Sequence, residues 1–328
     1  MPPPRRRRTI DYRSVVVYLA TQNRSTFDSV PGFSDRHEII ADDHMRVRNN
    51  FRLKCGMATR FKHPPLVEVI AELRWTAGVK TSTTDTGATE IRVPISAAAL
   101  SRADEFLMRF ASAVGEQGYS QVERLLPPGV PAIPFQPMYR FRKRELIPIT
   151  STLYQLGAGI FSVNITPPYQ SWSDFRPVVH QGLSALLRCR SEDERETPFT
   201  QLTLRYIDAF RENLLQNLSP RDFLRDVLGF QVAVPDAVSS LVAKGAQIVP
   251  QVNLTAPLQS GARMSLTVGE GRVNNEFAVI LDTSIQDTRA TKPALDTVMS
   301  AFDAAHDVLG EMFQKITKKL HPLMEPQS

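Results

Sequence analysis

Hydrophobic and polar residues alternate along Leu66–Trp75, directly after two prolines, and this period of two predicts a half-buried β-strand. The apolar members are expected to face the protein core together: Val67, Val69, Ala71, Leu73 and Trp75. Glu68, Glu72 and Arg74 alternate with them and are expected to form a charged row on the opposite face. We therefore expect this strand to bury one face of a sheet.

The same pattern analysis predicts further strands and helices along the chain. Strands are expected at residues 91–95, 139–144, 153–166, 199–210, 246–256, 261–268 and 275–285. Helices are expected after Ser96, Ser171 and Ser219, each of which can cap a helix N-terminus. Gly269 and Gly271 are expected to mark the turn between the last two strands.

A long helix is predicted over residues 294–320. Its apolar side recurs at alternating intervals of four and three residues: Leu295, Met299, Phe302, His306, Leu309, Phe313, Ile316 and Leu320. Val298, Ala305 and Met312 widen this stripe beyond the narrow seam of a coiled coil. We therefore expect the helix to lie on the protein's own sheet, or in the concave face of a curved sheet.

Short connections join neighbouring predicted strands, and such connections are typical of antiparallel pairing. The regular alternation of strands and helices found in a doubly wound parallel sheet is missing from the pattern. The predicted fold class is α+β, with mainly antiparallel, curved sheet packed against helices and a long C-terminal helix. The predicted division is a leader at residues 1–56 and a body at 57–328, with possible sub-units 57–210 and 211–328.

Positive charge is concentrated in residues 1–56, which hold 11 Lys and Arg against 6 Asp and Glu. The remainder holds 28 against 28, although the whole chain has a formal net charge of +5. Without apolar periodicity, this leader buries too little surface to offset its ordering entropy. The favoured interpretation is that translation begins at Met57, where a short polar lead runs into a strand. The alternatives are a folded element and a basic arm that binds nucleic acid weakly or contacts an acidic partner.

No stretch of the sequence approaches the roughly 18–20 apolar residues of a membrane span, and no signal-peptide pattern is present. The protein is therefore predicted to be cytoplasmic, without a membrane partner. Cys55 and Cys189 agree with a reducing compartment and are too few for a disulfide framework or a zinc site. Phosphate-loop, dinucleotide-binding and hydrolase motifs are also missing. No cofactor is predicted, and enzymatic activity is left open, with a non-enzyme favoured.

Charged residues on the predicted strands provide the first candidate binding residues. Arg205 is expected to face away from Leu204 and Tyr206, while Glu68 and Glu72 share one face of the opening strand. A cross-strand ion pair explains these residues without any function. The alternative is a carboxylate–guanidinium site for a phosphate or another acidic ligand.

Tyr206 and five more residues complete the candidate binding residues, and each of the five has more than one interpretation. Arg140, Arg142 and Arg144 alternate along one predicted strand, where a solvated face competes with contact to a phosphate backbone. His306 interrupts the apolar stripe of the last helix. It is interpreted either as a hydrogen-bonded core histidine or as a general base. Trp172 follows a helix cap and is interpreted as a core anchor rather than a stacking platform for a ligand.

Several of these segments together resemble a known family over about residues 57–320. The residues that carry the resemblance are PPLVEVIAELR at 64–74, QLG at 155–157, FSVN at 161–164, Trp172 with Phe175, LRYID at 204–208, and His306 before Phe313. The family is a set of sporadically distributed bacterial proteins of unassigned function. Its patchy distribution implies association with mobile elements or phage defence, and it contributes no catalytic residues.

The leading functional prediction is a non-enzymatic binding or accessory protein of such a bacterial module. A protein partner or a small ligand is expected, and the oligomeric state is open. The first alternative is a small-ligand-binding domain with a cavity between the curved sheet and the last helix. The second alternative is an enzyme whose site is assembled from distant parts of the chain.

Overall fold

A computed structural model of the chain describes residues 60–76, 80–83, 89–92, 97–127, 133–144, 151–168 and 171–327. The basic leader at residues 1–56 and the start predicted at Met57 lie outside the described residues. Those two predictions therefore stay predictions, and the structure concerns the body.

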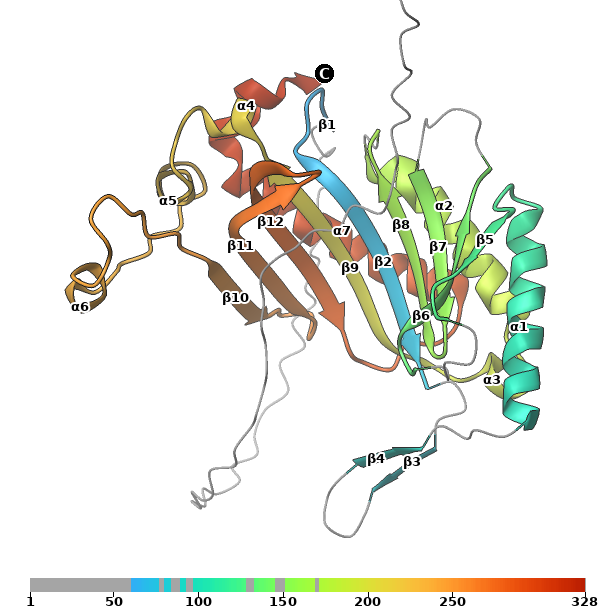
Figure 1. Cartoon of the computed structure of the whole chain (residues 1–328). Helices are drawn as coiled ribbons and strands as arrows, with labels where there is room; N and C mark the ends of the chain where they lie inside the picture. Colours follow the sequence, from blue (N-terminus) through green and yellow to red (C-terminus); the bar gives the residue numbers. More distant parts are fainter. Residues whose placement is uncertain are drawn as a thin grey trace, which may run out of the picture.

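Nine strands form one antiparallel sheet, which is the main layer of the described structure (Figure 1). In sheet order they are β10 (Val252–Pro257), β11 (Arg263–Val273), β12 (Glu276–Asp287), β9 (Phe199–Phe210), β2 (Leu66–Trp75), β8 (Ile160–Thr166), β7 (Ser151–Gly157), β6 (Pro137–Arg142) and β5 (Gln121–Arg124). The α+β class and the antiparallel sheet are confirmed. Strands from both possible sub-units, 57–210 and 211–328, lie side by side in this sheet, since β9 pairs with β12.

Two small ribbons accompany the main sheet. Strand β1 (Arg60–Phe61) pairs with β13 (Pro326–Gln327), so the first and last described segments meet. Strand β3 (Lys80–Thr83) pairs with β4 (Thr89–Arg92), close to the strand predicted at residues 91–95. The β1–β13 ribbon matters for function because it lies beside the pocket described below.

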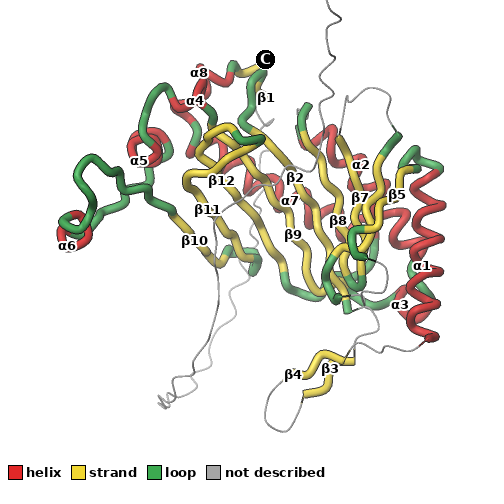
Figure 2. Tube along the Cα trace, in the orientation of Figure 1, coloured by secondary structure: helices red, strands yellow, loops and turns green. Residues whose placement is uncertain are grey.

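Three long helices cover one face of the sheet, as Figure 2 shows by its red and yellow layers. They are α1 (Ala97–Gly115), α2 (Trp172–Cys189) and α7 (Leu295–Ile316). Shorter helical segments are α3 (Glu192–Arg195), α4 (Glu212–Leu215), α5 (Pro220–Asp222), α6 (Asp236–Ser239), α8 (His321–Met324), a π-helical turn at Phe223–Val227 and a 3-10 turn at Lys318–Leu320. Within the described ranges, no helix has the length and apolar character needed to cross a membrane.

Helix α7 lies on the protein's own sheet, as its wide apolar stripe predicts. It contacts β9 and β12, and α2 packs beside it over β8. Its buried residues are Val298, Met299, Phe302, Ala305 and Leu309. Complete burial of a large apolar side chain stabilises a fold by about 1.5–3 kcal/mol, so this stripe is a major part of the core.

A β-bulge changes the predicted facing of one residue in β2. The register between β2 and β9 shifts between Leu66 and Glu68, which inserts Val67 as an extra residue. Val67 therefore packs with Ile207 and Ala209 on the face away from the long helices, and its predicted orientation is wrong. Strict alternation cannot reveal such an insertion, because the bulge reverses the facing of the residues before it.

The last hairpin turns at a different place from the one predicted. Asn274 and Asn275 both have positive φ, at 53° and 65°, and they connect β11 to β12. Gly269 and Gly271 lie inside β11, so the prediction that they mark the turn is wrong. A Cβ on Gly271 would lie 2.6 Å from Ile280 Cγ1 on the neighbouring strand. That glycine permits close packing of the sheet rather than a turn.

Several other predicted strands have different limits in the structure, and those predicted at 246–256, 261–268 and 275–285 are β10, β11 and β12 with the bounds given above. The strand predicted at residues 139–144 is β6, which ends at Arg142. The segment predicted at 153–166 is the hairpin of β7 and β8, with Gly159 at positive φ between them. The strand predicted at 199–210 is β9, with the same limits.

Candidate functional site

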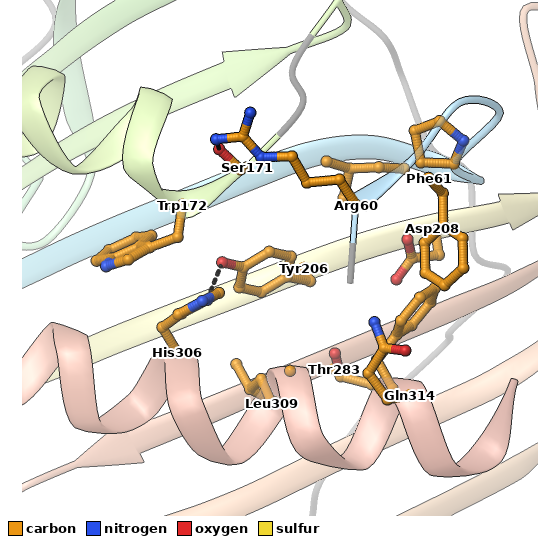
Figure 3. Close-up of a pocket in the computed structure, with 14 residues that line it drawn as sticks. Arg60, Phe61, Ser171, Trp172, Tyr206, Asp208, Thr283, His306, Leu309 and Gln314 are labelled. Atoms are coloured by element: carbon orange, nitrogen blue, oxygen red, sulfur yellow. Dashed lines mark hydrogen bonds between the residues drawn. The ribbon is translucent and has the colours of Figure 1, made fainter. Parts of the chain in front are cut away.

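A pocket of about 120 Å³ lies between the sheet and the second half of α7 (Figure 3). Its apolar walls include Phe61, Leu66, Trp172, Leu309 and Phe313. Polar residues that line it are Arg60, Ser171, Tyr206, Asp208, Thr283, His306 and Gln314. Such a space holds roughly ten water-sized groups, which sets the scale of a bound molecule.

The alternation of β9 explains why two of these polar residues face the helices. Tyr206 and Asp208 occupy the side of the strand that elsewhere carries Leu204 and Phe210, both of which are buried. Thr283 on β12 lies directly opposite Tyr206 in the antiparallel register. The sheet thus places a phenol, a carboxyl group and a hydroxyl group next to one another under α7.

Asp208 is the unusual member of this group, because its carboxyl group is buried without a partner. The residue is 3% exposed. Within the part of the chain that the structure describes, no hydrogen bond or ion pair reaches its carboxyl group. Burial, reinforced by the negative charge of Asp282, raises the pKa of Asp208 to about 8. The carboxyl group is therefore mostly protonated at neutral pH.

His306 and Tyr206 form a hydrogen-bonded pair at the other side of the pocket. The Tyr206 hydroxyl lies 2.9 Å from His306 Nδ1, and Figure 3 shows this bond as a dashed line. Burial lowers the pKa of His306, although the charges of Asp307 and Asp303 oppose that effect. His306 is thus a hydrogen-bonded histidine, and it also lines the pocket.

Trp172 stacks on the His306 ring, with ring centroids 5.0 Å apart and planes inclined by 12°. Its Nε1 donates to Asp303 on α7 over 2.8 Å, and Arg176 donates two hydrogen bonds to the same carboxylate. Burial opposes the shift, but these hydrogen bonds from Arg176 and Trp172 lower the pKa of Asp303. The Asp303 carboxylate therefore fixes the start of α2 against α7 and orients the indole ring in the pocket wall.

Strand β1, which comes before the main sheet in the sequence, closes one side of the pocket. Arg60 donates to the hydroxyl oxygens of Ser171 and Ser173 over 3.0 Å and 2.8 Å. The backbone N–H of Lys62, directly after β1, donates to the carbonyl of Glu325 over 2.9 Å. Contacts with α2 and with the last described segment thus hold this side of the pocket in place.

The remaining predicted residues, apart from Arg144, lie on the opposite face of the sheet. Arg205 makes a bidentate pair with Asp282 through Nε and Nη2, and not the predicted pair with Glu68 or Glu72. Glu68 accepts a hydrogen bond from Asn164 over 2.7 Å. Burial raises the pKa of Glu68, while the hydrogen bond and the positive charge of Arg205 oppose that effect.

The acidic and basic groups of this outer face compensate one another. Glu72 pairs with Arg74 over 2.7 Å, and Arg140 pairs with Glu123 on β5 over 3.1 Å. Burial lowers the pKa of Arg142, and the like charge of Arg140 adds to the effect, since the two share one face of β6 as predicted.

Arg144 does not extend this row, because β6 has ended before it and its side chain is exposed. The basic run of β6 is therefore shorter than predicted, and part of it is neutralised by carboxylates. This arrangement is that of a balanced polar face and gives little support to a phosphate-binding strip.

The sequence identified part of the pocket and missed part of it. Trp172, Tyr206 and His306 come together in the wall, whereas Asp208, Thr283 and Arg60 were not singled out. A signal for Asp208 was present, because an acidic residue there continues the buried apolar side of β9. Within the described ranges, no three His, Cys, Asp or Glu side chains gather closely enough to hold a metal ion.

Comparison of the chain with protein-family models, with curated proteins and with solved structures finds no significant match. The resemblance to a sporadically distributed bacterial family therefore stays a prediction.

Proposed function

We propose that this protein is a binding protein whose pocket between the sheet and α7 holds a small organic ligand. One observation carries the proposal: Tyr206, Asp208, Thr283 and His306 direct polar groups into a space whose other walls are mainly aromatic and aliphatic. Ligand sites combine a mainly apolar enclosure with a few convergent polar groups in this way. Polar residues at buried positions of two strands would weaken the core if they had no further role.

The structure of the wall suggests a direct test, because one residue of α7 can fill the pocket. Gly310 lines the pocket, and a Cβ added there would lie 3.9 Å from His306 Cε1, which is an ordinary contact. Gly310→Leu therefore places a side chain in the space while favouring the helix by roughly 0.5–1 kcal/mol. Gly310→Ala is the matched control, since it gives a similar helix benefit and leaves most of the pocket open.

The experiment measures binding of a library of small soluble fragments by ligand-observed NMR and by thermal shift. We expect fragments that bind the wild-type protein and Gly310→Ala to lose at least about tenfold in affinity for Gly310→Leu. Both variants should keep the melting temperature of the wild type or exceed it. Failure to detect any fragment, or equal binding by Gly310→Leu, would overturn the proposed function.

Protein binding in a mobile-element or phage-defence module stays a prediction, and one observation favours a protein contact. The segment around α6 projects from the edge of the sheet beside β10 in Figure 1. This segment exposes Leu241 at 86%, together with Val238 and Val249. The Gly310→Leu variant separates the two functions, because it fills the pocket and leaves this segment unchanged.

A further inference from the structure

We propose that the pocket recognises a small organic ammonium ion, and that the Asp208 carboxylate is the counter-ion which binds its N–H groups. This inference rests on the proposed function, because it names the ligand class of the same pocket. Its first basis is the lack of any partner for Asp208 within the described residues. A buried polar group without a partner is costly, and a ligand that donates hydrogen bonds removes that cost.

Other aspartates near the pocket show what Asp208 lacks. Asp282, on the neighbouring strand, accepts two hydrogen bonds from Arg205. Asp303, on α7, accepts two hydrogen bonds from Arg176 and one from Trp172. The fold therefore supplies a guanidinium group to each of these two carboxylates and supplies none to Asp208. A cation from solution would supply the positive partner that Asp208 does not receive from the fold.

The cationic and titratable side chains of the pocket are engaged elsewhere. Arg60, from β1, is bonded to two serine hydroxyls at the α2 end, and His306, from α7, is bonded to Tyr206 of β9. β2 and β12 contribute Leu66 and Thr283, which do not titrate, and the Asp282 side chain points to the opposite face. Neither Arg60 nor His306 lowers the pKa of Asp208, which burial raises first and the charge of Asp282 raises further.

The other walls suit an ammonium ion better than an anion. Phe61, Trp172, Tyr206 and Phe313 all line the pocket, and aromatic faces attract cations within about 6 Å. In Figure 3 the Asp208 carboxyl lies beside Phe61, with the Thr283 hydroxyl nearby as a further acceptor. An anionic ligand would meet the burial cost of its own charge next to the buried acid. The small volume limits the ion to one amine on a short aliphatic or single-ring body.

Binding requires one proton to leave Asp208. Near neutral pH the amine is already an ammonium ion, and the carboxyl group is protonated. As the ion pair forms, the carboxyl group releases its proton to solvent, and the ammonium ion keeps all of its protons. The measured affinity should therefore rise with pH up to about 8, by up to tenfold per pH unit.

The test uses three probes of one shape: benzylamine, benzyl alcohol and benzoate. We expect the full chain to bind benzylamine at least about tenfold more tightly than benzyl alcohol at pH about 8, and to bind benzoate most weakly. Between pH about 6 and about 8 the benzylamine affinity should rise, and calorimetry in buffers of different ionisation enthalpy should detect proton release. Benzyl alcohol should show neither effect.

Asp208→Asn is the matched variant, since it keeps the shape and removes the charge. It should reduce the benzylamine affinity to that of benzyl alcohol and leave benzyl alcohol binding within about twofold. A preference for benzoate or benzyl alcohol, or a benzylamine preference that survives in Asp208→Asn, would overturn this inference. Those outcomes leave the proposed function standing, because a ligand still binds. Absence of binding by all three probes and by the fragment library would overturn both.

Discussion

Asp208 and Asp282 lie on adjacent strands of one sheet, yet their carboxyl groups have opposite surroundings. Asp282 points to the outer face, where its side chain is 13% exposed and bonded to Arg205. Asp208 points to the inner face, where it is buried against the pocket without a cation. The outer face carries other charges that are paired, whereas the unpaired acid on the inner face points toward the pocket.

The difference separates a structural acid from a candidate functional one. An ion pair such as Arg205–Asp282 is explained by its own contacts, and it needs no ligand. An unpaired buried carboxyl group indicates either a partner from outside the fold or a fold that tolerates the free-energy cost of burying it. Three predictions test this comparison, starting from the largest expected effect.

The first prediction concerns the pH dependence of stability and follows from Asp208. An unfolded aspartate has a pKa of about 3.9, whereas burial raises that of folded Asp208 to about 8. The folded state therefore holds one more proton between these values, so Asp208 makes stability fall by about 1.4 kcal/mol per pH unit as pH rises through this window. Asp208→Asn should remove that fall and be more stable than the wild type at pH about 8.

Denaturant unfolding at several pH values provides the measurement for this prediction. Both proteins should have similar stability near pH about 4 to 5, where the wild-type carboxyl group is protonated in the folded state. Parallel stability curves for the wild type and Asp208→Asn would show that Asp208 is ionised in the fold. In that case the contrast with Asp282 would be lost.

The second prediction concerns the paired acid on the outer face. Asp282→Ala removes the partner of Arg205, and we expect a loss of about 1–2 kcal/mol, moderated because 40% of the Arg205 side chain is exposed. The matched control is Asp287→Ala, which breaks the pair with Arg289, whose side chain is 61% exposed. The control should shift the denaturation midpoint much less. Equal shifts for the two variants would contradict the interpretation of Arg205–Asp282 as a structural pair.

The third and smallest effect is expected for His306→Gln. Glutamine can keep a hydrogen bond to Tyr206 but loses the ring that stacks on Trp172, so the cost should be about 1 kcal/mol or less. Affinity for the pocket probes should change by less than about tenfold, and far less than in Asp208→Asn. A larger loss of binding with an unchanged melting temperature would show that His306, and not Asp208, is the main recognition residue.

Local patterns in the sequence predicted most of the elements that build the site. Alternation located β2 and β9, and the wide apolar stripe placed α7 on the sheet. Where the prediction failed, a single extra or unusual residue was responsible. The bulge at Val67 reversed its facing, and the hairpin turned at Asn274 and Asn275 because asparagine tolerates positive φ.

The partners of charged residues were beyond the reach of the sequence, because strand order is a non-local property. Arg205 was expected to meet the glutamates of β2, but β12 lies on its other side and brings Asp282 closer. The pocket has the same origin, since it draws residues from β1, β2, β9, β12, α2 and α7. Asp208 lay within the LRYID segment, yet its isolation depends on all of these neighbours.

The pairing of β1 with β13 implies a sequence of events during synthesis on the ribosome. Lys62, just after β1, bonds to Glu325, which is added to the chain 263 residues later. At about 5–20 residues per second, this interval is on the order of tens of seconds. The strands of the sheet are made during that time, whereas α7 and the segment that pairs with β1 are added only at its end. A nascent chain would therefore present Asp208 to the surroundings before the finished protein encloses it.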